Sequence, residues 1–452
     1  MTRTPRRWAP APVAARSADG PEVLPGGPGT IRPAGHPTVP VNIIRVTRWL
    51  LVLSAATSLV LVGGGEQLQT FAVTSVAKRI VLPIAYVAFA LVTMGTRTRP
   101  GRYPSWWVAL AVLLGATTAM EVFFSSQPLD LNAVAQGLAM LAGLLVVARA
   151  GLLATDWTDG HTRALLVTIF LAGAAAAVLD RSFNPFAALT VPTALGLLYL
   201  AIRERHHRGR HLLLGLVTAA AQIYWIAVDT KPASDATVGQ LALGTVVLVL
   251  AALPAAARRV AVYAAPVVVG LTAVWLGLVP LLTGTSTDSE QITLSHRSYE
   301  TAVVRESVGE SLAAQLVGLG PGATVDLSDS PDAETLAASG RDLERVDDVH
   351  LLTTYLLLKL GVAGVVWLGA FLAFFLRVLA RELRRPVPVR IILLVFAACG
   401  LIEAFPAATY LFANPLPALL LGILWATGGR AADVPSPPTA TASAPETVGT
   451  AS

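Results

Sequence analysis

The stretch that decides the fold covers residues 390–407 and reads RIILLVFAACGLIEAFPA. Arg390 and Glu403 are its only charged residues. The run approaches the ~20 residues that a helix needs to cross the ~30 Å hydrocarbon core of a bilayer. A chain in lipid must satisfy its own backbone hydrogen bonds, which leaves helices or closed barrels. Because its apolar residues are continuous and do not alternate with polar ones, the stretch predicts a transmembrane helix.

Other apolar segments of similar length extend this pattern over most of the chain. They lie at about 48–64, 80–96, 105–124, 131–150, 163–180, 186–202, 211–229, 238–256, 262–283, 360–379 and 410–427. Of the 452 residues, 54% are hydrophobic and 13% are charged, whereas soluble domains carry about 25% charged residues. Too few polar side chains remain to cover a water-soluble body, so we expect an all-α membrane protein with about 12 transmembrane helices.

Arginines mark one side of these expected helices. The loops after the second, fourth, sixth, eighth and tenth helices contain Arg97, Arg99, Arg102, Arg149, Arg163, Arg203, Arg205, Arg208, Arg210, Arg258, Arg259, Arg381, Arg384, Arg385 and Arg390. The short loops on the opposite side are poor in cations, and only Lys78 and Arg79 clearly depart from the pattern. Since loops rich in Lys and Arg stay in the cytoplasm, both termini are expected there. The net charge of +5 reflects these orientation signals and does not indicate a nucleic-acid partner.

The expected topology divides the chain into five parts. Residues 1–46 and 428–452 are rich in Pro, Ala and other small residues, which favours disordered cytoplasmic tails. Residues 47–283 hold helices 1–9, and residues 351–427 hold helices 10–12. Residues 284–350 form one large extracytoplasmic loop with thirteen acidic residues against four arginines.

The large loop contains helical signals of its own. Apolar residues spaced four apart predict a helix over 297–316; they are Val304, Val308, Leu312 and Leu316. Residues 318–322 read GLGPG, which predicts a sharp turn. Residues 323–348 look irregular and solvent-exposed. Helical spacing resumes at 350–360, and Gly361 separates that stretch from the body of the tenth helix.

Ionisable residues within apolar helices are costly, which makes them candidates for function. Here they gather near the outer ends of the expected helices, on the side of the large loop; they are Glu121, Glu403, Asp180, Arg181, Asp229 and Lys231. An outward-facing site at the membrane surface would explain this grouping. The alternative is that each group near a helix end simply reaches water.

The loop supplies two further candidates. His350 lies where the acidic loop meets the next helix, and histidine can act as a base near neutral pH. Arg297 follows His296, and its planar, permanently charged guanidinium suits phosphate. Each could instead be an ordinary solvated side chain. The sequence shows no P-loop, no zinc-protease motif and no dense His/Asp cluster, and its single cysteine, Cys399, excludes an internal disulfide.

The order of these features over about 180–375 resembles the O-antigen ligase and O-antigen polymerase family of bacterial envelope enzymes. In that family a loop arginine precedes a helix, a glycine-rich turn follows, and a histidine then begins a helix with a downstream glycine. The matching residues are Arg297 to Glu300 (RSYE), Gly318 to Gly322 (GLGPG), His350, Tyr355, Leu357, Gly361 and Gly364, with the polar stretch Arg181 to Phe186 before an earlier helix. Two positions depart from the family pattern. Leu351 follows the histidine in place of Asn or Ser, and Lys231 stands where the family has a Ser-Arg pair.

The resemblance implies an architecture like that of the glycosyltransferase-C class and a metal-independent, inverting glycosyl transfer without a cofactor. The donor would be a polyprenyl-diphosphate-linked glycan, and the acceptor a hydroxyl of a glycan or lipid at the outer face of the bacterial plasma (inner) membrane. By this resemblance, His350 is the expected general base and Arg297 the expected catalytic cation. Arg181, Lys231 and Arg305 are expected to bind the diphosphate. Membrane lipids are the only other partners implied.

Two other functions stay open at the level of sequence. A multi-pass transporter or flippase of a lipid-linked saccharide or small substrate would show internal repeats and broken helices near the bilayer midplane. We find no convincing repeat, and the ionisable residues avoid the midplane. A non-catalytic scaffold, whose acidic loop binds a partner, would tolerate the loss of both His350 and Arg297.

Overall fold

The structure is a computed structural model, and it is helical wherever it shows regular structure. It describes residues 91, 103–124, 131–154, 157–179, 187–228, 235–260, 288–331, 333–334, 343–346, 349–405, 411–412 and 415–428. The expected first and ninth transmembrane helices, nearly all of the second, and both tails lie outside these residues. In the described part, the sole strand-like feature is an isolated antiparallel bridge between Val325 and Val346. The all-α class is therefore confirmed.

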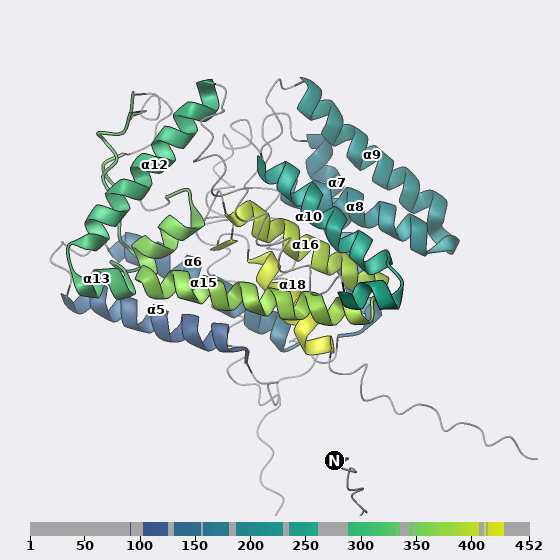
Figure 1. The fold of residues 1–452 in the computed structure, drawn as a ribbon, viewed down its shortest axis with the longest axis horizontal. Helices are drawn as coiled ribbons and strands as arrows, with labels where there is room; N and C mark the ends of the chain where they lie inside the picture. The colour runs from purple at the N-terminus through teal and green to yellow at the C-terminus, as the bar shows by residue number, and fades with distance from the viewer. Residues whose placement is uncertain are drawn as a thin grey trace, which may run out of the picture. The chain divides into compact units, whose positions relative to one another are not determined.

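Most expected helices appear within a few residues of their expected bounds (Figure 1). The helices are α5 (Ser105–Phe124), α6 (Leu131–Leu152), α7 (Asp159–Leu179), α8 (Ala187–Arg203), α9 (Arg208–Val228), α10 (Asp235–Ala252), α12 (Asp288–Gly309), α13 (Leu312–Val317), α15 (Leu352–Arg384), α16 (Pro388–Ala404) and α18 (Leu416–Gly428), with the short 3-10 helix η3 (Arg205–His207) between α8 and α9. Apart from α12, α13 and η3, these helices follow the long apolar runs of the sequence, which polar residues flank.

Helix α16, which contains most of the stretch quoted first, lies at the centre of the described helices. It contacts α7, α8, α10, α15 and α18. Its side chains from Ile391 to Cys399 are all buried. A helix that is hydrophobic on every side has no polar face to turn to water, so it becomes the core around which the others pack.

Three described helices are long and apolar enough to cross a membrane. They are Ser105–Phe123, Ala133–Leu152 and Leu352–Arg384. Shorter apolar helices occur at Gly160–Leu171, Thr190–Arg203, Val238–Ala252 and Leu416–Gly428. Helix α9 also exposes several large apolar side chains, including Leu213 and Ile223. These features support the membrane assignment, whereas the number twelve and the orientation stay predictions.

The loop helix differs from its predicted form. The sequence predicts one helix over 297–316, but the structure has two, α12 and α13. Ser311 ends the continuity because its backbone is extended and its hydroxyl accepts a hydrogen bond from Ala314 N at 3.1 Å, which caps a new helix. The four apolar residues of the predicted helix are all helical, but they differ in burial. Val304 and Val308 are buried, whereas Leu312 is 71% exposed and Leu316 53%.

The predicted glycine turn at 318–322 is confirmed, and it packs directly against α15. Gly318 and Gly361 have φ of 79° and 65°, in the left-handed region that glycine adopts readily. Leu319 N donates to Leu358 O at 2.9 Å. A Cβ on Gly318 would lie 2.5 Å from Leu360 N, and one on Gly361 would lie 2.5 Å from Gly318 N. The two backbones therefore cross with no room for a side chain, and Gly361 divides α15 as expected.

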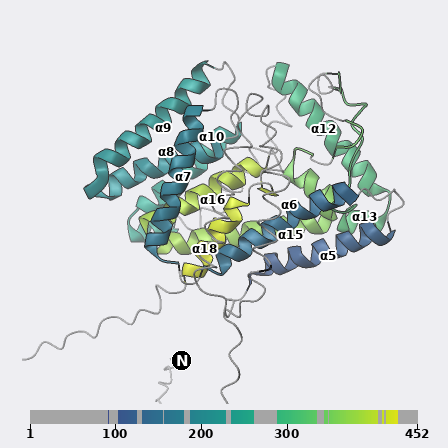
Figure 2. The same ribbon diagram turned by 180° about the vertical axis from the view of Figure 1, so that it is seen from behind.

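Two buried charged side chains form hydrogen bonds with the backbone at the end of this turn. The Glu121 carboxylate of α5 accepts from Gly322 N at 3.0 and 3.1 Å. Lys359 of α15, which is 1% exposed, donates to Ala323 O at 2.6 Å. Figures 1 and 2 both show α13 beside the end of α5 and α15. The turn thus sets the positions of α12, which precedes it in the chain, and of α15, which follows it.

The described part of the segment after the turn is irregular, as predicted, and it is exposed at some positions, such as Thr324, Asp326 and Ser328, but not at others. Val325 and Leu327 are 4% and 0% exposed, and Ser330 is 6% exposed. Hydrogen bonds join Val325 to Val346 in both directions at 2.9 Å, and Leu327 N to Leu343 O at 2.8 Å. Alternate positions therefore point inward, which a sequence dominated by acidic residues does not reveal.

Candidate functional site

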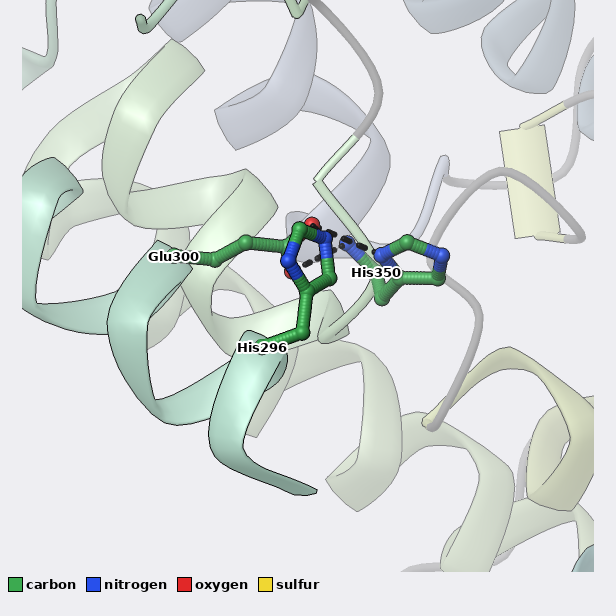
Figure 3. Close-up of side chains that lie close together, drawn as sticks. All are labelled: His296, Glu300 and His350. Atoms are coloured by element: carbon green, nitrogen blue, oxygen red, sulfur yellow. Dashed lines mark hydrogen bonds and ion pairs between the residues drawn. The ribbon is translucent and has the colours of Figure 1, made fainter. Parts of the chain in front are cut away.

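Three side chains from two segments meet at the start of α15. His296 and Glu300 come from α12, and His350 lies two residues before α15, as Figure 3 shows. Glu300 Oε1 lies 3.0 Å from His296 Nε2 and 2.7 Å from His350 Nδ1. The two imidazole rings stand nearly perpendicular, with centroids 5.6 Å apart. The sequence analysis singled out His350 but missed Glu300 and His296 as its partners.

The local sequence explains why α12 presents these two residues together. His296, Glu300, Val304 and Val308 follow one another at four-residue spacing, so they share one face of the helix. All four are buried, and α12 packs against α15. The buried stripe thus begins with two polar residues and continues with two valines. That continuation is the signal that could have identified Glu300, because a carboxylate in a buried stripe requires partners.

Glu300 is held as a carboxylate. Its side chain is 1% exposed, and His350 N donates to Oε2 at 3.2 Å in addition to the two ring contacts at Oε1. Burial raises the pKa of Glu300, but hydrogen bonds from His296 and His350 and the charge of His350 outweigh burial and lower the pKa to about 2. The site therefore keeps a buried negative charge at neutral pH.

His350 is the more accessible of the two histidines. Its side chain is 26% exposed, whereas that of His296 is 7% exposed. Nδ1 of His350 faces Glu300, and Figure 3 shows the other ring nitrogen on the opposite side of the ring, away from the carboxylate. A carboxylate can only accept, so Nδ1 carries the proton in this pair. The lone pair of a neutral His350 is then on Nε2.

The loop after the glycine turn reaches the same cluster through Ser330. Its Oγ lies 2.9 Å from His296 Nδ1, and its side chain is buried. Four residues are consequently joined in the order Ser330, His296, Glu300 and His350. Within the sequence these contacts span 34, 4 and 50 residues.

The three donor atoms of His296, Glu300 and His350 lie within 4.8 Å of one another, close enough to hold one metal ion. The sequence analysis expected no metal site, because the sequence shows no dense His/Asp cluster. However, both ring nitrogens are directed at the same oxygen, Glu300 Oε1, which occupies the position between them. Hydrogen bonding therefore accounts for this geometry.

The structure describes only some of the other predicted site residues. Arg297 is half-buried on α12 beside His296, and Arg305 is exposed on the same helix. Arg181 and Lys231 lie outside the described residues, as do Asp180 and Asp229.

Two of the outer ionisable residues have structural partners away from the histidines. Glu121 binds the glycine turn. Glu403 of α16 accepts from the side-chain amide of Gln240 on α10, and both are buried. Glu121 thus joins α5 to the glycine turn, and Glu403 joins α16 to α10.

No family model matches the chain, and no curated protein matches it.

Proposed function

We propose that the protein is a membrane glycosyltransferase of the O-antigen ligase or polymerase type. It transfers a glycan from a polyprenyl diphosphate carrier to an acceptor hydroxyl at the outer face of the bacterial plasma membrane. The observation that carries this proposal is the hydrogen bond between the buried Glu300 carboxylate and His350 Nδ1, which makes Nε2 the basic atom of a neutral His350 whose side chain is 26% exposed. The motif resemblance supplies the reaction class.

The proposed reaction is a single displacement. The acceptor oxygen attacks the anomeric carbon while its proton passes to His350 Nε2, and the bond from that carbon to the diphosphate breaks with inversion. Polyprenyl diphosphate departs with the electron pair of that bond. The new imidazolium of His350 lies against the Glu300 carboxylate, which stabilises its positive charge.

Cations would stabilise the departing diphosphate. Arg297 is the first candidate because it follows His296 on α12, and a guanidinium fork matches phosphate oxygens. Arg305, Arg181 and Lys231 are the further candidates. The bilayer around the apolar helices that could cross a membrane would hold the polyprenyl tail.

The test replaces His350 or Arg297 by Ala in the native host and measures surface polysaccharide and lipid-linked glycan. We expect loss of polymer by at least about 100-fold for His350→Ala, because a general base contributes roughly 10²–10⁴-fold. Lipid-linked glycan should accumulate at the outer leaflet. Matched controls are His207→Ala and Arg345→Ala, which remove an exposed histidine and an exposed loop arginine.

The outcomes separate the three functions. Normal polysaccharide in both variants, at normal protein level, would refute the catalytic proposal and favour a scaffold. Glycan that accumulates only on the inner leaflet would identify a flippase. Arg297→Lys should also be impaired, because lysine keeps the charge and loses the fork.

A further inference from the structure

Ser330 belongs to the acidic segment after the glycine turn, for which the proposed reaction has no role so far. Its side chain is buried, and its backbone is held in a turn by Ser330 N to Leu327 O and Ala333 N to Ser330 O, each at 3.0 Å. Leu327 itself is 0% exposed. The protein thus anchors this part of the loop so that one hydroxyl faces His296.

Donors and acceptors in the cluster can be assigned in only a few ways. The Glu300 carboxylate accepts, so His296 Nε2 and His350 Nδ1 each carry the proton directed at it. A neutral imidazole carries one N–H, which leaves His296 Nδ1 with a lone pair. The Ser330 hydroxyl, 2.9 Å away, is the matching donor. One buried carboxylate balances a single positive charge, and the reaction places that charge on His350.

We infer that Ser330 and His296 are positioning residues, which act through Glu300 to hold His350 with Nε2 as the basic atom. The inference rests on the proposed function and deepens it. Glu300 sets the tautomer of His296 by accepting from its Nε2, and Ser330 donates to Nδ1 and holds the ring in the orientation that supplies this second hydrogen bond to Glu300 Oε1. Glu300 in turn fixes the ring orientation and tautomer of His350. In the described part of the acidic segment, Ser330 is the one buried serine, and it connects this segment to the reacting atoms.

Loss of the Ser330 hydroxyl has a defined consequence. His296 Nδ1 would be buried without its donor, so the ring loses the contact that fixes its orientation. The Nε2–H is then held less firmly against Glu300. The carboxylate in turn is freer to shift, so His350 spends less time in the reactive orientation.

A spectroscopic test reads the tautomers without a substrate. The full chain, labelled with ¹⁵N in its seven histidines, would be placed in lipid nanodiscs at neutral pH. Signals of His296 and His350 are assigned by their loss in His296→Gln and His350→Gln. We expect a protonated Nε2 with an unprotonated Nδ1 for His296, and the reverse for His350. Wild-type protein in which His296 is protonated on Nδ1 would overturn the inference, whatever happens to the variants.

Variants at the loop test the connection itself. Ser330→Ala should shift the ¹⁵N signal of His296 Nδ1, which loses its hydrogen-bond donor, and Ser330→Thr, which keeps the hydroxyl, should restore the wild-type pattern. The matched control is Ser328→Ala, because Ser328 is exposed and its hydroxyl donates to Asp326 instead of His296. Identical spectra of Ser330→Ala and wild type would refute the role of Ser330.

The kinetic test uses native-host membrane vesicles with their own lipid-linked glycan. We expect kcat for polymer formation to fall about tenfold in Ser330→Ala, with KM unchanged and with rescue by Ser330→Thr. An unchanged kcat would refute the inference while His350→Ala still abolishes turnover, so the two proposals can fail separately. Stoichiometric zinc in the purified chain, lost in His296→Gln, would also overturn it and assign the cluster to a metal ion.

Discussion

The start of α15 and its end each bury one glutamate between two basic side chains, but the partners differ in kind. At the start, Glu300 lies between His296 and His350. At the end, Glu382 receives two hydrogen bonds from Arg390, both at 2.7 Å, and one from Arg381 Nη2 at 3.0 Å. Arginine stays charged at every physiological pH, whereas histidine gains or loses a proton near neutrality.

The two clusters also differ in the groups that surround them. Arg381 and Arg390 also donate to the carbonyl of Leu424, and Arg381 stacks over Trp425 with its guanidinium carbon 5.2 Å from the ring centroid. This cluster joins α15, α16 and the end of α18. In the Glu300 cluster, the side chain of His350 is 26% exposed. At the end of α15, permanently charged side chains thus join helices. At its start, the histidines can gain or lose a proton, as the proposed reaction requires.

The largest expected effect comes from breaking the arginine cluster. Glu382→Ala should leave two buried or half-buried guanidinium groups without their carboxylate, which costs about 3–5 kcal/mol when one partner of a buried pair is removed. We expect much less folded protein and a lower Tm in detergent. Glu306→Ala, at an exposed glutamate, is the control. A Tm equal to wild type would show that this cluster does not lock the helices.

Acid should distinguish the two clusters next. The pKa of Glu300 falls from 4.5 to about 2 on folding, so its contribution is fully present above pH 4.5 and is lost as the pH falls toward 2. The shift corresponds to about 3 kcal/mol. Thermal unfolding between pH 6 and pH 3 should show this loss in wild type and a flatter profile in Glu300→Gln. Equal slopes in the two proteins would contradict the assigned pKa.

A smaller free-energy effect is expected on the reaction. Glu300→Gln keeps an acceptor for His350 Nδ1 but removes the negative charge that stabilises the imidazolium. We expect polymer formation per molecule of folded protein to fall about 100-fold, or about 2.7 kcal/mol. Glu300→Asp should recover part of the rate. If Glu300→Gln turns over like wild type, the Glu300 cluster is structural, like that of Glu382.

The sequence predicted those features that depend on neighbours along the chain. Residues 105–124 and 390–407 predict helices because their apolar runs are long and bounded by polar residues. The observed bounds of α5 and α16 match these two runs closely. The turn at 318–322 and the break at Gly361 were equally local. The break between α12 and α13 was missed because the four-residue apolar spacing continues through Gly309 and Ser311.

The candidate site was predictable in part, for the same reason. His350 and Arg297 stand out by residue type, but the partners of His350 lie 50 and 54 residues away on α12. Ser330 lies among acidic residues, where nothing in the sequence marks it as buried. Only the packing of α12 on α15 and the inward turn of residues 325–330 bring these groups together.

The crossing of the glycine turn over α15 has an evolutionary consequence. At Gly318 and Gly361 each backbone occupies the space that a side chain of the other would need. Substitution at one position cannot be compensated by substitution at the other, because both changes add atoms to the same contact. Among related chains the two glycines should therefore persist as a pair or disappear together with the crossing. A search for distant relatives can use this pair, with the histidine eleven residues before the second glycine, as a structural signature.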